Sequence, residues 1–443
     1  MMHPRIFLVI TVIAVWVPAL AQRAPDNVLI FDGYGYNYQP CEPSIAVSPA
    51  NPRHMVAGSI LDRVHVSKDG GWTWETETLT SQYGVYGDPC IVASPKKDFY
   101  YLHLSNPDGQ AWSSEALLDR IVIQRSKKAG KRWNKGAGMG LNGSKDQDKE
   151  WAAVSTDGST LLTCWTQFDL YGSPAEADST VILCSTSNRK AKKWSEPVRI
   201  NAIAGDCRDG DETVEGAVPD IAADGTMYVA WAQADTIWMD RSSDGGQTWL
   251  KRDLRVATIA GGWDQDIRGV GRANGMPVTR VDRSNGPHSG RVYVSWTDNR
   301  NGEDDNDVWL VYSDDQGRNW TDPVRVNDDP PGAQQFFPWM DVDDVTGNVH
   351  IVFYDRRASF AKHQDLNLRS TWDTEVYVAS SYDGGETWEN LRVSEKKFRT
   401  NPKGFFGDYN NISAYDGIVR PIWTRNDDGV LSIWTAILDG YVE

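Results

Sequence analysis

One eight-residue phrase, Ser-x-Asp-x-Gly-x-x-Trp, occurs four times in this chain and constrains its fold more than any other feature. The copies are Ser67–Trp74, Ser242–Trp249, Ser313–Trp320 and Ser381–Trp388. A phrase that returns at long spacing marks one supersecondary unit that is built repeatedly. The sequence therefore predicts a repeat architecture.

Each copy has the residues of a hairpin turn. The Asp can accept hydrogen bonds from backbone N–H groups, the Gly allows a positive φ, and the Trp anchors the next strand. Two weaker copies, Ser126–Trp133 and Ser187–Trp194, keep the spacing of Ser and Trp but carry Lys128 and Arg189 in place of the Asp. We therefore count six copies of the turn.

The phrase resembles the Asp-box, or BNR, repeat of the sialidase superfamily, where the box joins the third and fourth strands of a β-propeller blade. The resemblance implies an all-β propeller over most of the chain. It also implies an enzyme with an arginine triad for the substrate carboxylate, a Tyr nucleophile assisted by Glu, and an Asp acid/base.

Seven segments have similar starts, and we expect each to be the innermost strand of a blade. They begin at Glu42, Asp88, Glu150, Val218, Met276, Phe337 and Asp408. Only three strands fit after Asp408, and the segment Asn27–Asp32 can supply a fourth. We predict seven blades closed by this N-terminal strand, which leaves no open sheet edge. Six blades are the alternative, if the unit around Ser187 is an insertion.

The first residues have the pattern of a secretory signal. Arg5 precedes the apolar run Ile6–Val17, and Ala19-Leu20-Ala21 is typical of a cleavage site. The run is shorter than the roughly 20 residues that span a bilayer. We expect a signal peptide at 1–21 and a single propeller domain at 22–443, secreted or periplasmic, without membrane insertion.

The formal net charge of −16 argues against nucleic acid or an anionic membrane as partner, since both would be repelled. Such acidity is also typical of a soluble secreted protein. We expect a monomer whose partner is an extracellular glycan or glycoconjugate.

Five cysteines are present, and export would permit disulfides. Cys164 and Cys184 fall on two strands of one predicted hairpin, while Cys41 and Cys90 lie at the starts of neighbouring blades. The pairing stays open, and an odd count leaves one thiol over. No Cys/His spacing is typical of zinc, and we expect no metal or cofactor. One acidic loop, with Asp304, Asp305 and Asp307, could bind calcium or be a solvated charge run.

The order of strands divides the charged residues between two faces. If the boxes lie on one face, the loops between blades open on the other, where propellers commonly bind ligands. Glu42, Asp88, Glu150 and Asp408 start innermost strands of consecutive blades and predict an acidic half of this opening. Arg300, Arg356, Arg357 and Arg425 end second strands and predict a basic half.

These residues support two main hypotheses. The first is a secreted sialidase-like glycoside hydrolase, with Asp88, Glu150 and Asp408 as candidate acids and Tyr354 or Tyr409 as candidate nucleophile. Glu42, Tyr409 and the four arginines would contact the substrate, because arginine binds carboxylate in a fixed geometry.

The second hypothesis is a non-catalytic propeller that binds glycan or protein at the same opening. In that case the acids and arginines pair with each other and hold loops to blades. A polysaccharide lyase is a third reading, with His103, His363 and Tyr354 as the residues to inspect.

Overall fold

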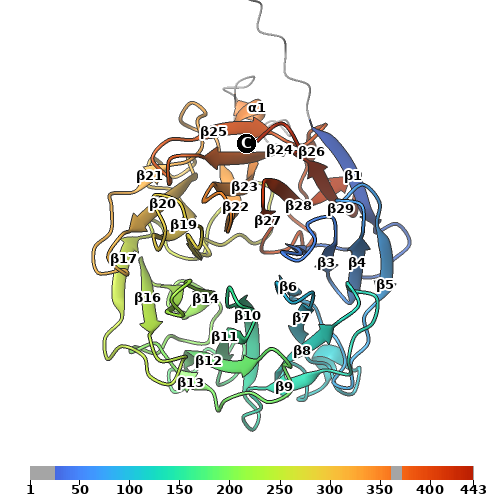
Figure 1. The fold of residues 1–443 in the computed structure, drawn as a ribbon, viewed down its shortest axis with the longest axis vertical. Coiled ribbons are helices and arrows are strands. Elements are labelled where there is room, and N and C mark those ends of the chain that lie inside the picture. Colours follow the sequence, from blue (N-terminus) through green and yellow to red (C-terminus); the bar gives the residue numbers. More distant parts are fainter. Residues whose placement is uncertain (1–24, 361–371, 443) are drawn as a thin grey trace, which may run out of the picture.

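The computed structural model describes residues 25–360 and 372–442, and it is almost entirely β-structure. Seven sheets are arranged radially around a central axis as the blades of a propeller (Figure 1). Six have four strands, and the sheet that begins with β22 has a fifth, short strand, β26. The seven-bladed, all-β propeller predicted from the sequence is confirmed, and the six-bladed alternative is wrong.

Blades one to four each run outward from the axis in chain order. Their strands are β2 (Ser44–Val47), β3 (Met55–Ser59), β4 (Arg63–Ser67), β5 (Glu75–Thr78), β6 (Cys90–Ala93), β7 (Phe99–Leu104), β8 (Ile121–Ser126), β9 (Ala137–Met139), β10 (Asp146–Val154), β11 (Thr160–Phe168), β12 (Thr180–Asn188), β13 (Val198–Arg199), β14 (Glu215–Ile221), β15 (Met227–Gln233), β16 (Thr236–Ser242) and β17 (Leu254–Thr258).

Blades five to seven follow the same order, except that the last blade takes its outer strand from the start of the chain. Their strands are β18 (Val278–Val281), β19 (Val292–Asp298), β20 (Asp307–Ser313), β21 (Val324–Arg325), β22 (Gln335–Val342), β23 (Val349–Asp355), β24 (Asp373–Ser381), β25 (Glu389–Arg392), β26 (Phe398–Arg399), β27 (Asn411–Tyr415), β28 (Ile418–Asp427), β29 (Val430–Ile437) and β1 (Asp26–Asp32).

The N-terminal strand closes the ring. β1 pairs antiparallel with β29, from Asp26 opposite Ile437 to Asp32 opposite Ser432. The predicted closure is therefore confirmed. The predicted signal peptide at 1–21 lies outside the described residues.

The six box turns each join the third and fourth strands of a blade, as predicted. In the clean copies the Asp organises the turn: Asp244 accepts the Ser242 hydroxyl at 2.7 Å and the Thr248 N–H at 2.9 Å. In the weaker copies the Ser and the Trp form a β-bridge, at Ser126 with Trp133 and Ser187 with Trp194. We call the face that carries these turns the box face and the opposite opening of the channel the mouth.

Two prolines lie further inside their strands than we expected. Pro219 is within β14 and Pro338 within β22, and both strands begin before Val218 and Phe337, the predicted starts. β10 likewise begins at Asp146 rather than Glu150. Each of the three strands has a register shift near its start, and an innermost strand has one unpaired edge, so a missing N–H costs little there.

Large aromatic side chains pack within and between the blades. Trp151 and Trp339 have ring centroids 4.2 Å apart, and Tyr409 lies 5.0 Å from Trp151. These three come from blades three, six and seven, so their contact joins blades across the axis. No helix in the described part of the chain is long and apolar enough to cross a membrane.

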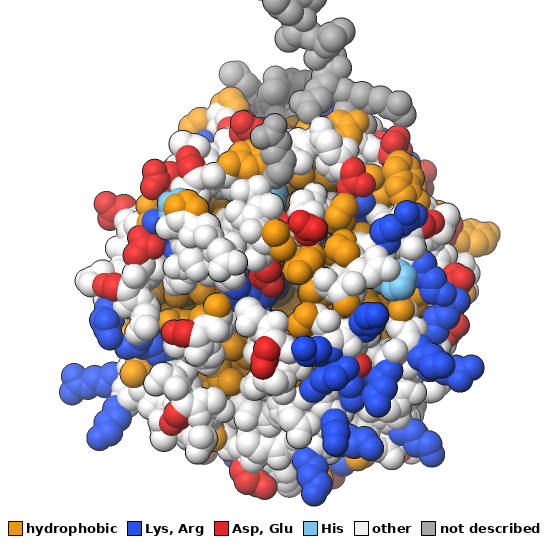
Figure 2. Space-filling view, in the orientation of Figure 1, with side chains coloured by type: hydrophobic (Ala, Val, Ile, Leu, Met, Phe, Trp, Pro, Cys, Tyr) orange, Lys and Arg blue, Asp and Glu red, His pale blue; other side chains and the backbone are white. Residues whose placement is uncertain are grey.

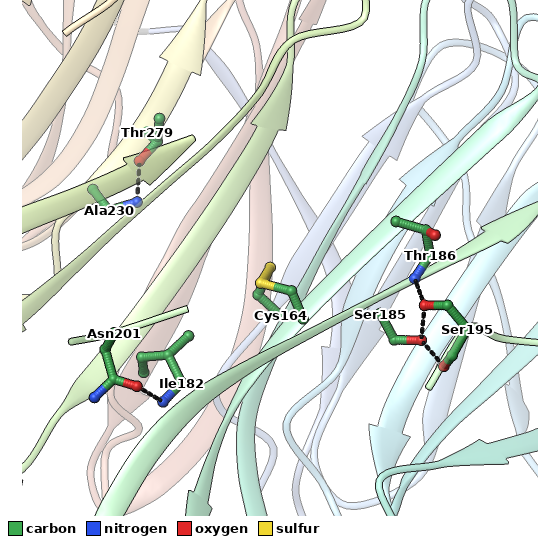
Figure 3. The surroundings of a disulfide bond; sticks show 9 residues. Cys164, Ile182, Ser185, Thr186, Ser195, Asn201, Ala230 and Thr279 are labelled. Carbon is green, nitrogen blue, oxygen red and sulfur yellow. Dashed lines mark hydrogen bonds between the residues drawn. A yellow bond between two sulfur atoms is a disulfide. The ribbon is translucent and has the colours of Figure 1, made fainter. Parts of the chain in front are cut away.

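One disulfide crosses blade three (Figure 3). Cys164 on β11 faces Cys184 on β12 with 4.2 Å between their Cα atoms, which is within reach of a disulfide but shorter than the common spacing. The pairing considered for these two strands is confirmed. Cys41, Cys90 and Cys207 are free and buried.

Candidate functional site

The ammonium group of Lys149 lies at the centre of a cluster of acids at the mouth. Its Nζ is 2.7 Å from Asp408 Oδ2, 3.6 Å from Asp88 Oδ2 and 4.0 Å from Glu42 Oε1. These acids precede β27, β6 and β2, so the closed ring brings blades seven, two and one against Lys149 of blade three. The structure thus joins three of the acids predicted from the sequence.

The left-handed backbone at the starts of these innermost strands helps to aim the side chains. Glu42, Asp88 and Lys149 have φ values of 51°, 48° and 52°. Non-glycine residues seldom adopt this conformation, and it is often retained at functional sites. We infer that the local backbone turns these three side chains toward one another.

Arg272 extends the cluster into a continuous polar network. Its Nε donates to Asp408 Oδ1 at 2.9 Å, a second guanidinium N–H reaches Asp408 Oδ2, and Nη1 donates to Asp209 at 2.9 Å. The Tyr171 hydroxyl donates to the same Asp209 oxygen at 2.5 Å. The network therefore runs from Tyr171 through Asp209, Arg272, Asp408 and Lys149 to the acids of blades one and two.

A cavity of about 470 Å³ opens above this network. Its lining includes Lys149, Arg272, Asp408 and Asp209, together with Asp264 and Trp263 from the loop between blades four and five. The volume suits a small ligand such as one or two sugar units.

Burial and mutual repulsion give the acids of the mouth different protonation states. Burial, reinforced by Asp88, raises the pKa of Asp148 to about 7. Burial also raises the pKa of Asp88 and, well above its ordinary value, that of Glu42. Burial opposes ionisation of Asp408 as well, but Lys149 and Arg272 hold its pKa well below the ordinary value. A charged carboxylate therefore lies among acids that tend to keep their protons.

Two further glutamates lie deeper and have no partner among the described residues. Both carboxyl oxygens of Glu150 and of Glu215 are buried without a hydrogen bond. Burial raises the pKa of both well above the ordinary value, because water no longer solvates the charge. Glu150 therefore adds a neutral acid beneath the mouth.

Three of the arginines expected at the mouth instead hold neighbouring blades together. Arg300, Arg357 and Arg425 each follow or end a second strand and pair with an aspartate of the same segment: Asp298, Asp355 and Asp427. Each also stacks on an aromatic ring of the third strand, that of Trp309, Tyr377 or Trp434.

Each of these arginines also reaches the preceding blade. Arg300 donates to the Thr258 carbonyl at 2.9 Å, Arg357 pairs with Asp328, and Arg425 pairs with Glu395 at 3.2 Å. In the described residues none has an ion pair with the acids around Lys149. The geometry agrees with the alternative in which these residues pin loops to blades.

Arg356 is buried and bound by neutral groups. It donates to the Arg268 carbonyl and to the hydroxyls of Thr374 and Thr400. Burial, with a contribution from Arg268, lowers its pKa to about 9. Arg268 and Thr400 belong to loops and Thr374 to β24, so Arg356 holds two loops against this strand.

The tyrosines chosen from the sequence are enclosed. The Tyr354 hydroxyl donates to the Thr424 carbonyl at 2.7 Å and accepts the Thr424 N–H at 3.0 Å, so it joins blades six and seven. Tyr409 is buried against Trp151, with Lys149 Nζ 5.7 Å from its ring centroid. Tyr409 thus supports the cluster from below, and Tyr354 is occupied elsewhere.

The histidines considered for a lyase give that reading no geometric support. His103 is buried within blade two, bonded to Leu104 and Gln124, and burial lowers its pKa to about 4. His363 lies outside the described residues.

The acidic loop considered for calcium binds protein groups instead. Asp304 pairs with Arg268, Asp305 accepts the Gly332 N–H, and Asp307 pairs with Arg325. Among the described residues no group of three or more His, Cys, Asp or Glu could hold a metal ion.

Sequence reasoning missed Lys149, Asp148, Arg272, Tyr171 and Asp209. Lys149 had a usable signal, because it stands between Asp148 and Glu150 at the start of a strand predicted to be innermost. Arg272 lies in the loop between β17 and β18, and nothing in the sequence of that loop predicts contact with Asp408, which is 136 residues away.

Comparison with known proteins agrees with this architecture. Residues 159–405, more than half of the chain, match the BNR repeat-like domain. The chain therefore belongs to the family of BNR repeat-like domains, and its fold is a seven-bladed propeller.

Solved structures with a similar fold include a protein of unknown function from Dyadobacter fermentans, 12% identical with a TM-score of 0.50, over 94% of this chain and 99% of that one. Hadza microbial sialidase Hz136 is 14% identical with a TM-score of 0.49, over 88% and 74%. An α-L-arabinanase of Penicillium chrysogenum, complexed with arabinobiose, is 13% identical with a TM-score of 0.46, over 75% and 94%. At these identities the likeness concerns the fold alone.

Proposed function

We propose that this protein is a glycoside hydrolase that cleaves an extracellular glycan at the mouth of the propeller. The observation that carries the proposal is one cluster in which Lys149 and Arg272 bind Asp408 and hold its pKa well below the ordinary value, while burial raises the pKa of Asp88 and raises that of Asp148 to about 7. Carboxyl groups whose environments separate their pKa values in this way can share acid and base roles.

Each group has a role in this reaction. Asp88 or Asp148 donates a proton to the glycosidic oxygen as the bond to the anomeric carbon breaks. The Asp408 carboxylate stabilises the positive charge that develops on the sugar. A water molecule then adds to the anomeric carbon and gives a proton back to the aspartate that had protonated the leaving group. The neighbouring Tyr171–Asp209 pair is the candidate nucleophile or water-orienting group.

The charge of the mouth favours a neutral or cationic sugar over sialic acid. A sialidase binds the substrate carboxylate with an arginine cluster, whereas Arg300, Arg357 and Arg425 here pair with Asp298, Asp355 and Asp427. Arg272 is the one arginine of the described residues that lines the cavity, and it is already bonded to two carboxylates.

A panel of aryl glycosides, with aryl sialosides included, tests this proposal. We expect turnover of a neutral or amino-sugar glycoside, and a fall of about 100-fold or more in kcat/KM for Asp148→Asn or Asp88→Asn. Removing the proton donor should lower kcat/KM less for a substrate with a dinitrophenyl leaving group, because that leaving group needs no protonation. Asp224→Asn, an exposed acid in the β14–β15 turn, is the matched control.

A second candidate is glycan binding without turnover. It is favoured by the full pairing of Asp408 with both Lys149 and Arg272. Calorimetric binding of a glycan that the protein does not hydrolyse would support this candidate and overturn the first.

A further inference from the structure

The box face over blades two and three carries a dense group of cations. The box turns Ser126–Trp133 and Ser187–Trp194 each contain four Lys or Arg and no acid, for a formal charge of +4. The four clean boxes range from 0 to −2. Lys96 and Lys97 lie in the β6–β7 turn on the same face. We call these two boxes and this turn the basic stripe.

Contacts between blades make the stripe continuous. Arg189, in the box of blade three, donates to the Lys96 carbonyl at 3.0 Å and pairs with Asp98 at 2.6 Å. The Tyr100 hydroxyl of blade two donates to the Arg189 carbonyl at 2.8 Å. The box of blade three is thereby fixed beside the turn that carries Lys96 and Lys97.

Nine of the ten cations of the stripe are exposed and Arg189 is half-buried, and most have no ion pair among the described residues. Of its ten Lys and Arg, only Lys131 and Arg189 have an ion pair among the described residues, with Glu75 and Asp98. Lys131 also approaches Lys68 of the box in blade one, and this contact lowers the pKa of Lys68. Figure 2 shows Lys and Arg side chains gathered at the lower right of the face in view, over β7, β8 and β9.

In an acidic chain, such a group of like charges is stable only because solvent screens it. In the two boxes of the stripe, Lys128 and Arg189 replace the box Asp. These two cations therefore occupy the position that organises the turn in the clean boxes. A surface of unpaired lysines attracts a polyanion that neutralises several of them at once.

We propose that the basic stripe binds an acidic polysaccharide and holds the protein on a polyanionic glycan matrix while its mouth, on the opposite face, stays open. The partner is a flexible chain that contacts the stripe alone, because the net charge of −16 repels larger anionic bodies. This inference goes beyond the proposed hydrolysis and does not depend on it.

Two observations favour a polysaccharide over nucleic acid. First, most cations of the stripe are lysines, and Arg189, the arginine in the contact between blades, is paired with Asp98. Phosphate recognition favours free, planar guanidinium groups. Second, Trp133 and Trp194 pack against the core clusters and offer no open platform for stacking bases.

The test is binding of alginate and of dextran sulfate at low ionic strength. We expect a salt-sensitive Kd for the wild type and about tenfold or weaker binding by the variant K127Q/K128Q/K192Q/K193Q. The matched control, K251Q/R252Q/R318Q/K403Q, removes equal charge outside the stripe and should bind like the wild type. Any turnover at the mouth should be unchanged in both variants.

A footprint on the unmodified protein removes any dependence on variants that fail to fold. Bound alginate should protect Lys127, Lys128, Lys192 and Lys193 from acetylation more than Lys251 and Lys403. The proposal is overturned if neither polysaccharide binds, if the control variant loses as much affinity, or if protection is uniform. Binding to single-stranded DNA or to phosphatidylglycerol vesicles, with none to the polysaccharides, also overturns it.

Discussion

The two ends of the central channel both bury charge but balance it differently. At the box end, a cavity of about 270 Å³ is lined by Arg280 and Arg283. Arg280 lies 2.9 Å from Asp341, and Arg283 lies 2.8 Å from Asp344 and 3.5 Å from Asp220. At the mouth, Lys149 and Arg272 face more acids than they can neutralise, and in the described part of the chain the buried carboxyl oxygens of Glu150 and Glu215 accept no hydrogen bond.

The difference teaches how to separate structural charges from functional ones. At the box end each of the three acids lies within 3.5 Å of an arginine, and these ion pairs hold blades together. A surplus of acids forces some to keep their protons, which is the condition for acid catalysis near neutral pH. Substitutions confined to one end of the channel can therefore separate the two kinds of charge.

Arg283→Met should have the largest effect on stability. It removes the cation between Asp220 and Asp344 and leaves two buried carboxylates without it. Breaking a buried pair from one side costs about 3 to 5 kcal/mol, and denaturant unfolding measures it. Arg318→Met, at an exposed position of a box, should stay within about 0.5 kcal/mol; an equal loss there would remove the contrast.

Lys149→Met should destabilise the protein less than Arg283→Met but reduce its activity more. Arg272 still binds Asp408 in this variant, so we expect a loss of about 1 to 3 kcal/mol. Without the ammonium group the pKa of Asp408 rises, and hydrolysis should fall along with the ionised fraction. The pH profile of kcat/KM measures this change, and an unaltered profile would contradict a functional role for Lys149.

Asp148→Asn should change how stability depends on pH. The folded-state pKa of Asp148 is about 7, above its unfolded value near 4. Its contribution to the free energy of unfolding is therefore complete below about pH 4. This contribution is lost as the pH rises toward 7, because over this range the unfolded state releases the proton while the folded state still holds it. In the Asp148→Asn variant this pH-dependent loss of stability should be absent. Unfolding measured between pH 4 and 8 checks the slope, with Asp157→Asn on the box face as the control.

Glu150→Gln should have the smallest effect. The carboxyl group has no hydrogen bond among the described residues, and burial raises its pKa well above the ordinary value. A neutral amide of nearly the same shape should therefore replace it with a change within about 1 kcal/mol. Thermal unfolding at pH 7 measures it. A loss as large as that of Arg283→Met would mean that Glu150 is ionised and paired.

The fold could be predicted because its signals are local. The box turns, the β-rich segment before the first blade and the cysteines of one hairpin each depend on a few neighbouring residues. The mouth could be located for the same reason, since Glu42, Asp88 and Asp408 start innermost strands whose positions around the ring follow from blade order.

The partners of each charge could not be predicted, because they depend on contacts between distant loops. Arg272 meets Asp408 only after the ring has closed. The arginines are instructive, since Asp298 and Asp355 stand two residues before Arg300 and Arg357, and Asp427 two after Arg425. That spacing indicates local pairing, and it outweighs the expectation of a substrate clamp.

The pairing of Asp26 with Ile437 makes the last blade depend on both ends of the chain. As the polypeptide leaves the ribosome, β1 emerges first and must wait for β29, while the other blades can assemble from strands already next to them. Blade seven is therefore the last to be completed during synthesis. Under a force applied at the two termini, it should be the first to part.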